Sequence, residues 1–348
     1  MSINITKIRA LAIEDLVEQL QDYGVDNAGN FSAAELVFEL ACQQSHGQNI
    51  QIEGILEILP EGFGFLRSPI SEYAPGADDA YVSPAQIRRF NLRTGDRILG
   101  EARIPKEKER YFALLRIKKV NNRSPEDEKN RLTFETKTLD SPNEPVLFKR
   151  KLIDISNSKN SKEVLKGDKS LLLLGRFYHS RDLVIQFLQA LSEDSVLVLL
   201  NYPPEDLAII RRVWDEEIFA SLRGSAAAQH QQILEIGKER AKRLVEQGKN
   251  VNLIIFTLNE VALTKKSDSE QSGETGAEAF AIEMVQSSLS LGRNFIGEGS
   301  LTVWAGVHQD RSDFEQKIVE RALYEVSHRF IVDPKQSATD IVINETLS

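Results

Sequence analysis

Apolar residues near the start of the chain recur at the three- and four-residue spacing of an amphipathic helix. The spacing is carried by Ile8, Leu11, Leu16, Val17 and Leu20. Gly24 and the run Asn27-Ala-Gly-Asn30 interrupt it. Ser32 precedes Glu35 by three residues, which is the pattern of a capping box at the start of a second helix. The pattern therefore predicts a small helical bundle over residues 4–45.

From residue 50 the helical spacing of apolar residues ends, and short strand-like runs follow. These are Ile52, Gly54–Ile58, Gly62–Leu66, Ala80–Val82, Ile98–Ala102 and Tyr111–Val120. Turn residues separate the runs, at Pro60–Gly62, Pro75-Gly76, Thr94–Asp96 and Pro105-Lys106. Closely spaced short strands of this kind predict a small five-stranded barrel, such as an OB-fold, over residues 49–121.

A polar, charged and proline-containing stretch follows, and residues 122–160 are predicted to be a linker with one strand at Leu132–Phe134. Beyond it, apolar runs typical of buried parallel strands alternate with helical stretches. The strand-like runs are Leu171–Leu174, Val196–Leu200, Val251–Phe256 and Leu301–Ala305. The helical stretches are Arg181–Leu191, Glu205–Glu217, Gln229–Gln247 and Ala277–Leu291. Residues 161–348 are therefore predicted to form an α/β domain with a parallel sheet.

Composition narrows the class of protein. The 348 residues carry a net charge of −9, and 41% of them are hydrophobic, as in an ordinary globular protein of two or three domains. The single cysteine, Cys42, excludes a disulfide framework and a multi-cysteine metal site. No apolar run is long enough to span a bilayer and no secretory signal is recognisable, so we expect a cytoplasmic protein without a membrane partner. Residues 50–121 alone carry a net positive charge, of +2, and are the first place to look for nucleic-acid binding.

The predicted barrel carries the most informative side chains. Strand alternation places Phe63, Phe65 and Arg67 on one face, and the same rule groups Asp79 with Tyr81 and Glu109 with Tyr111. Aromatic rings beside a cation on an exposed strand face form a platform on which bases can stack. The alternative is that these aromatic residues are core residues of the barrel.

Four runs in this region resemble the cold-shock-type RNA-binding domain of the bacterial transcription termination factor Rho family. They are Gly62–Arg67, Asp78–Pro84, Gln86–Asp96 and Glu109–Leu115, and the resemblance covers residues 54–121. Residues 1–48 are similar to the short helical domain that precedes it in that family. The resemblance implies a primary site for pyrimidine-rich single-stranded RNA, with cytosine favoured, made of Phe63, Phe65, Arg67, Asp79, Tyr81, Glu109 and Tyr111.

The chemistry of these side chains agrees with such a site. Stacking on an aromatic ring is worth about 1–3 kcal/mol per base. A carboxylate beside the stack can accept a hydrogen bond from the exocyclic amine of cytosine, which uracil lacks. Arg67, Arg88, Arg89 and Lys106 are candidates for phosphate contacts, although Arg88-Arg89 alone could equally be a solvated surface pair.

A weaker resemblance to Rho continues through the α/β domain, which it identifies as a RecA-like P-loop ATPase domain that has lost its motifs. A P-loop needs glycines for the phosphates, a lysine and a Ser/Thr for Mg²⁺. In the corresponding stretch Gly167 remains, but Tyr178-His-Ser-Arg181 replaces the Gly-Lys-Thr end, with Ser180 at the lysine position. Arg176 or Arg181 could attract a phosphate there, but neither restores the loop.

Three further positions depart from the family pattern. Asn201-Tyr-Pro-Pro stands where a catalytic carboxylate is expected, and Phe256–Asn259 stands where a metal-linked aspartate is expected. Asp340 occupies the expected position of the trans-acting arginine, which has the opposite charge. The loops that bind RNA in the central pore of family members are not recognisable here, and only Gly273–Gly276 weakly resembles one of them. We therefore expect no catalytic residues, and since the five histidines are scattered we expect no metal and no cofactor.

The leading hypothesis is a pseudo-ATPase: an RNA-binding Rho paralogue that takes part in transcription termination or its regulation without hydrolysing ATP. Its partners would be C-rich RNA and either Rho subunits or further copies of itself. A divergent but active Rho, an RNA-dependent ATPase and helicase, is the alternative. A third possibility is a barrel that binds another protein.

Overall fold

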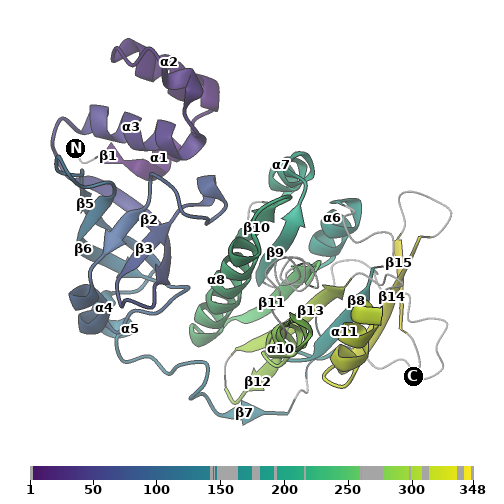
Figure 1. The fold of residues 1–348 in the computed structure, drawn as a ribbon. Helices are drawn as coiled ribbons and strands as arrows, with labels where there is room; N and C mark the ends of the chain where they lie inside the picture. Colours follow the sequence, from purple (N-terminus) through teal and green to yellow (C-terminus); the bar gives the residue numbers. More distant parts are fainter. Residues whose placement is uncertain are drawn as a thin grey trace. The chain divides into compact units, whose positions relative to one another are not determined.

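The computed structural model describes residues 3–141, 144, 146, 164–174, 181–191, 194–214, 217–258, 260, 277–297, 299–307, 313–334 and 341–345. Contacts between Cα atoms divide the chain into two compact units, Met1–Leu132 and Thr133–Ser348 (Figure 1). We call these unit 1 and unit 2 and describe each by itself.

Unit 1 begins with a short strand, three α-helices and one 3₁₀ helix in the segment where helical periodicity is found. These elements are β1 (Ile3–Asn4), α1 (Ile5–Arg9), α2 (Ile13–Asp22), the 3₁₀ helix η1 (Ala28–Asn30) and α3 (Ala33–Ser45). The predicted capping box is confirmed, because the Ser32 hydroxyl accepts from the Glu35 N–H while the Glu35 carboxylate accepts from the Ser32 N–H. His46 ends α3 in the left-handed conformation, one residue before Gly47.

The rest of unit 1 is the predicted five-stranded barrel. Its strands are β2 (Ile50–Ile58), β3 (Gly64–Arg67), β4 (Ala80–Val82), β5 (Arg97–Arg103) and β6 (Phe112–Val120). They are hydrogen-bonded in the order β2-β3-β4-β6-β5, and β5 pairs with β2 again to close the barrel. β4 and β6 are parallel and the other barrel pairs are antiparallel, which is the strand order of an OB-like barrel.

The sequence analysis missed two short α-helices of unit 1 and the 3₁₀ helix η2 (Pro69–Ser71), which lies between β3 and β4. α4 (Pro84–Phe90) lies between β4 and β5, and α5 (Pro125–Glu128) follows β6. The signal for α4 was present in the sequence, since Ser83 caps it, Pro84 stands at its first position and Gln86 closes a capping box.

The first helices and the barrel share one hydrophobic core. Leu16, Leu36 and Leu40 belong to the same buried cluster as Leu56 and Phe112. The Phe38 and Phe112 rings lie 5.0 Å apart. The predicted boundary between residues 48 and 49 therefore runs through a continuous core.

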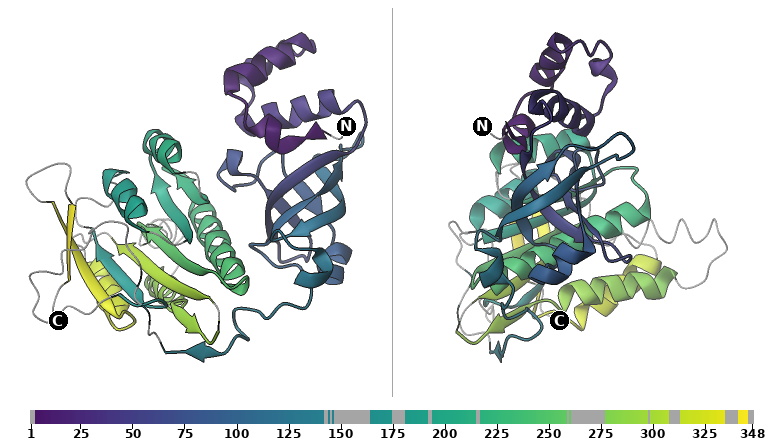
Figure 2. Two further views of the ribbon diagram at one scale, coloured as in Figure 1. Left: turned by 180° about the vertical axis from the view of Figure 1, so that it is seen from behind. Right: turned by 90° about the vertical axis from the view of Figure 1, so that its left-hand side faces the viewer.

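Unit 2 is the expected α/β sheet. Its central order is β10 (Ile218–Leu222), β9 (Asp194–Tyr202), β11 (Asn250–Phe256), β13 (Ser300–Val307), β8 (Lys169–Leu173), β14 (His328–Pro334) and β15 (Ile341–Glu345). All these neighbours are parallel except β15, which is antiparallel to β14. The short strands β12 (Arg293–Phe295) and β7 (Leu139–Asp140) extend the sheet beside β13 (Figure 2).

Helices cover both faces of this sheet. α6 (Arg181–Ala190) and α7 (Pro204–Val213) bury their apolar side chains in one cluster with Leu197 and Leu199. α8 (Ala227–Glu246) packs on the opposite face. Its Gly237 lies so close to Val198 that an added Cβ would meet that side chain, and Val198 points away from the face of Leu197 and Leu199 because side chains alternate along a strand. α10 (Ala277–Leu289) and α11 (Asp313–Leu323) contact each other. Trp304 lies fully buried, and its indole N–H donates to Asn252 at 2.9 Å.

The segment that connects the units packs on each of them in turn. The buried Arg131 forms ion pairs with Asp96 at 2.9 Å and Glu128 at 3.2 Å within unit 1. Phe134 is buried in unit 2, edge-on to Phe295 at 5.1 Å. The strand predicted at Leu132–Phe134 is wrong: these residues enter a turn, because Phe134 is held by side-chain burial rather than by strand pairing.

The barrel closure predicts the effect of one glycine substitution. A Cβ at Gly100 would lie 2.5 Å from the Arg116 carbonyl oxygen and 2.7 Å from Leu114. We expect Gly100→Ala to lower the opening free energy of β5 and β6 amides by about 1–3 kcal/mol, measured by hydrogen exchange on the full chain. The control is Gly29→Ala, since nothing lies within 4 Å of its added Cβ. Equal exchange in both variants would contradict the close approach.

Candidate nucleic-acid interface

Four aromatic rings gather on one face of the barrel, and we call them the aromatic cluster: Phe63, Phe65, Tyr81 and Tyr111. Phe65 on β3 pairs directly with Tyr81 on β4. The ring centroids of Phe63 lie 5.8 Å from Phe65 and 5.6 Å from Tyr81, and those of Phe65 and Tyr111 lie 4.8 Å apart. All four rings are partly exposed, so they are not core residues of the barrel. The two strands that carry Phe65 and Tyr81 are those with which OB-folds bind oligonucleotides.

Arg67 lies beneath this cluster rather than beside it on the surface. Its guanidinium carbon is 4.9 Å from the centre of the Phe65 ring, a cation–π contact. The side chain is buried and forms ion pairs with Glu57 at 2.6 Å and Asp79 at 2.5 Å. A phosphate contact by Arg67 would therefore require this buried guanidinium to become exposed.

Asp79 is fully buried, and burial raises the pKa of its carboxyl group to about 6 although Arg67 opposes the shift. Its Oδ2 accepts hydrogen bonds from Arg67 and from the Gly76 N–H at 2.9 Å. Its Oδ1 has no hydrogen-bond partner within the described part of the chain. The neighbouring Asp78 pairs with Arg9 of α1 at 2.7 Å.

Glu109 lies in the loop before β6 and is engaged by its own loop. Arg103 donates to both carboxylate oxygens, at 2.5 and 2.8 Å, and the Lys106 N–H donates at 3.1 Å. These hydrogen bonds lower the pKa of Glu109 to about 2, so the ion pair persists at mildly acidic pH. The pair fixes the loop that carries Tyr111, two residues further on.

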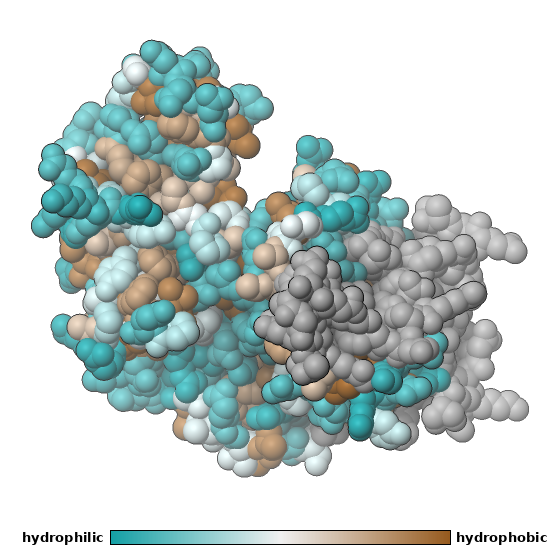
Figure 3. Space-filling model, viewed as in Figure 1, coloured by the Kyte–Doolittle hydropathy of each residue, from teal (hydrophilic) through white to brown (hydrophobic). Residues whose placement is uncertain are grey.

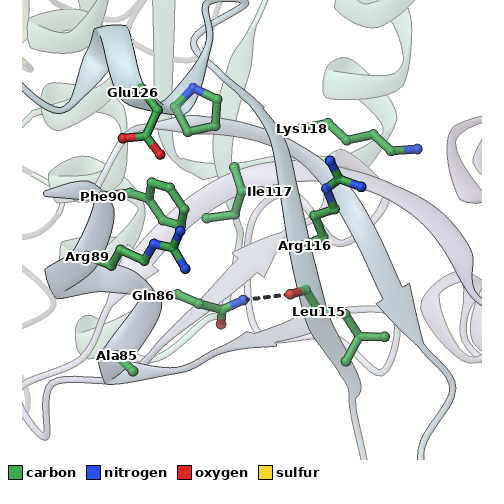
Figure 4. Close-up of a pocket in the computed structure, with 10 residues that line it drawn as sticks. Ala85, Gln86, Arg89, Phe90, Leu115, Arg116, Ile117, Lys118 and Glu126 are labelled. Carbon is green, nitrogen blue, oxygen red and sulfur yellow. Dashed lines mark hydrogen bonds between the residues drawn. The ribbon is translucent and has the colours of Figure 1, made fainter.

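Arg88 and Arg89 lie in the last turn of α4 and are both exposed. Arg89 stacks over Phe90 at 5.0 Å. It lines a groove of about 650 Å³ between α4, β6 and α5, where Phe90 and Ile117 lie among Arg116, Lys118 and Glu126 (Figure 4). The groove and the aromatic cluster have no lining residue in common.

On the face shown in Figure 3, apolar patches over the N-terminal helices are interrupted by hydrophilic residues.

The sequence analysis missed three residues that support the aromatic cluster: Glu57, Arg9 and Arg103. Glu57 could have been found from strand pairing, because it lies on β2 directly opposite Phe65. Its side chain is therefore on the same face of the barrel as Arg67, which follows Phe65 by two residues. Arg9 acts through Asp78, 69 residues away in the sequence, so local patterns give no sign of it. Arg103 binds Glu109, six residues further on in the same loop, so its opposite charge was a local signal.

In unit 2, the residues at the predicted nucleotide site can be tested for fit to ATP with Mg²⁺, the group that the Rho resemblance implies. Mg²⁺ requires oxygen ligands. The Asn201 amide instead donates to Glu260 at 2.8 Å and accepts from Gly224 at 3.2 Å, and the Thr257 hydroxyl donates to the Leu200 carbonyl at 2.6 Å. These two side chains, at the carboxyl ends of β9 and β11, supply no carboxylate for Mg²⁺ and are hydrogen-bonded to neighbouring groups of unit 2.

The remnants of the phosphate loop are only partly described. Gly167 has a φ of 90° and its N–H donates to Thr302 at 3.0 Å. Arg181, the first residue of α6, pairs with Asp206 at 3.0 Å. Ser180, Tyr178, Arg176 and Asp340 lie outside the described residues, as does Gly273–Gly276.

Two histidines lie in buried pairs, His230 with the Ser221 hydroxyl at 2.7 Å and His328 with Asp168 at 3.0 Å. Over the described residues, no three His, Cys, Asp or Glu side chains form a group that could hold a metal ion. Within the same ranges, every helix is too short or too polar to cross a membrane.

An OB-like barrel with an aromatic face defines a single-strand nucleic-acid-binding module, here followed by a mostly parallel α/β sheet. Residues 52–126 match the family model "Rho termination factor, RNA-binding domain". The chain is 34% identical over 316 residues to transcription termination factor Rho of Chromobacterium violaceum, covering 87% of this chain and 76% of the relative. It is 33% identical to Rho of Escherichia coli over 321 residues, covering 87% and 75%. The chain belongs to the Rho family of transcription termination factors.

One solved structure, of an ATPase from the type III secretion system of pathogenic bacteria, matches with a TM-score of 0.48 and 13% identity. The match covers 58% of this chain and 61% of that chain. A likeness at this level carries no argument about function.

The buried position of Arg67 predicts a structural cost for its removal. In Arg67→Gln, Glu57 and Asp79 lose their shared cation while they remain buried. We expect a loss of about 3–5 kcal/mol in the opening free energy of β3 and β4, measured by hydrogen exchange at neutral pH. Arg88→Gln removes an exposed cation from the same unit and should stay within about 0.5 kcal/mol of the parent. A stable Arg67→Gln barrel would show that the ion pairs are not structural.

Proposed function

We propose that this Rho-family chain binds single-stranded, pyrimidine-rich RNA through the aromatic cluster and does so without hydrolysing ATP. The observation that carries the proposal is the gathering of four partly exposed rings with centroid distances of 4.8 to 6.1 Å on β3, β4 and the loops beside them. Bases of single-stranded RNA stack on such rings irrespective of sequence.

The proposed preference for cytosine comes from one carboxylate next to the rings. Asp79 Oδ1 has no hydrogen-bond partner within the described residues, and it would accept from the amine of cytosine, a donor that uracil lacks, once RNA binding exposes this buried group. Glu109 is ionised throughout the physiological range and is bound to Arg103, so its part in the site is to hold the loop of Tyr111. Arg88, Arg89 and Lys106 provide the exposed cations for phosphates.

The absence of catalysis rests on unit 2. Asn201 and Thr257 bind neighbouring backbone and side-chain groups in place of a metal-bound nucleotide. Arg181 is paired with Asp206, so it provides no free cation for a phosphate. In this proposal the RecA-like domain, residues 161–348, is a scaffold that packs against Rho subunits or against further copies of the chain.

The helical segment 1–48 and the cold-shock-type barrel 49–121 then act together as the RNA-binding part, with residues 122–160 as the connection. Such a protein would modulate transcription termination in the cytoplasm by competing for RNA or by entering a Rho ring that it cannot power.

The RNA site predicts a difference between two aromatic substitutions. Phe65→Ala removes the ring in contact with the other three members of the aromatic cluster, and should weaken binding to a C-tract oligonucleotide by about ten- to hundred-fold. Tyr23→Ala removes an exposed ring outside the cluster and should bind like the parent. The measurement is fluorescence anisotropy with C-tract and A-tract RNA at two salt concentrations. Equal affinity of the parent for both tracts would overturn the proposed site.

The nucleotide site makes a second prediction. The purified chain should bind no ATP in a calorimetric titration and release no phosphate when C-tract RNA is added, because the described oxygen ligands are already engaged. RNA-stimulated turnover that disappears in Arg181→Ala would favour the divergent active Rho instead. Turnover that survives this substitution would point to a contaminating enzyme.

A further inference from the structure

The groove between α4, β6 and α5 presents an apolar floor between positive charges. Phe90 and Ile117 form the floor, and Leu115, which is 49% exposed, lies beside them (Figure 4). Arg89 lies on the α4 side of the groove and Arg116 on the β6 side. Neither arginine forms an ion pair within the described part of the chain. The groove therefore offers a partner both apolar contact and positive charge that is not neutralised.

The other charged residues of the groove leave this positive charge in place. Lys118 of β6 is already paired with Glu101 at 2.7 Å. Of the ten residues drawn in Figure 4, Glu126 alone is acidic, and it faces the two unpaired arginines. A groove with an apolar floor and a positive rim suits a helix that carries aliphatic side chains beside carboxylates.

Helix α2 has such an edge. Its Ile13 and Val17 lie one turn apart, and Glu14 and Glu18, also one turn apart, run beside them. Ile13 is 54% exposed, and Val17 is partly buried. Both glutamates are exposed and form no ion pair among the residues that the structure describes. Like charges one turn apart destabilise a helix, so this edge has a cost that the folding of unit 1 does not repay.

The edge and the groove lie at opposite ends of unit 1 (Figure 1, Figure 2). α2 packs on α3, whereas the groove lies between α4, α5 and β6. A chain therefore cannot place its own α2 in its own groove, but a second copy brings the matching edge at the same concentration as the groove. Contact between two different surfaces of identical chains is head to tail, and it builds rings or open arrays.

We propose that copies of this chain associate head to tail through unit 1, with the Ile13–Glu18 edge of α2 seated in the groove of the next copy. The aliphatic side chains of the edge cover Leu115, and its two glutamates pair with Arg89 and Arg116. This inference goes beyond the proposed function, in which the RecA-like domain packs against other subunits. Arg89 serves either a phosphate or a second copy, so association is measured without RNA.

The test is sedimentation of the full chain over a range of concentrations at low and high salt. The parent should associate as its concentration rises, and more weakly at high salt because ions screen the charges. Two charge-reversed variants should each associate more weakly by about tenfold or more, since like charges then face each other. They are Arg89→Glu/Arg116→Glu in the groove and Glu14→Lys/Glu18→Lys on α2.

A mixture of these two variants tests the pairing itself. In the mixture the reversed α2 of one variant meets the reversed groove of the other, and the unchanged surfaces also match. Association should return to within about threefold of that of the parent. The control Lys108→Glu/Arg110→Glu makes the same change in net charge as the groove variant, at exposed positions of the loop between β5 and β6, and should sediment like the parent.

Three results would overturn the inference. The first is a parent that stays monomeric at every concentration. The second is association that survives in both variants, which would place the contact outside these two surfaces. The third is a mixture that does not associate although melting curves show that both variants are folded. RNA binding by the parent is measured separately by anisotropy, so its failure would remove the proposed function and leave the head-to-tail contact to be judged by sedimentation alone.

Discussion

Strand β2 is hydrogen-bonded along both edges, to β3 on one side and β5 on the other, and this closure determines the position of the aromatic cluster. The pairing sets Glu57 opposite Phe65, and the next pairing sets Phe65 opposite Tyr81. A slip of one residue in either register would send each ring into the core and a core leucine to the surface. The glycines at the crossings, such as Gly64 beneath the Glu57 carbonyl, allow the strands to approach closely enough for this order to hold.

The sequence predicts those parts of the site that depend on local alternation. Phe63, Phe65, Tyr81 and Tyr111 were expected on one surface, and they lie there because each is positioned by its own strand or turn. Arg67 shares that alternation, yet it is buried, because Glu57 and Asp79 stand ten and twelve residues away and their convergence depends on the barrel. Strand order and closure are likewise non-local. The continuous apolar runs predicted β8, β9, β11 and β13, whereas β10, with Ala220 and Ser221 in its middle, carries no such run.

At the carboxyl edge of the sheet in unit 2, polar groups satisfy one another. The side chain of Asn201, a residue with a φ of 54°, accepts a hydrogen bond from the Gly224 N–H and donates one to Glu260. The backbone N–H of Asn201 donates to the Ser221 hydroxyl, which also contacts the His230 ring. Such a web stabilises three loops at once. The same side chains would have to give up these hydrogen bonds to bind a phosphate or a cation, which is why the proposed function assigns this edge a structural role.

The placement of the tryptophans separates the two units optically. Trp214 and Trp304 both belong to unit 2, whereas Tyr81 and Tyr111 belong to the aromatic cluster of unit 1. Indole emission therefore reports on unit 2 alone, because unit 1 contains no tryptophan. In an unlabelled sample it follows melting of the sheet without any signal from the barrel that carries the aromatic cluster.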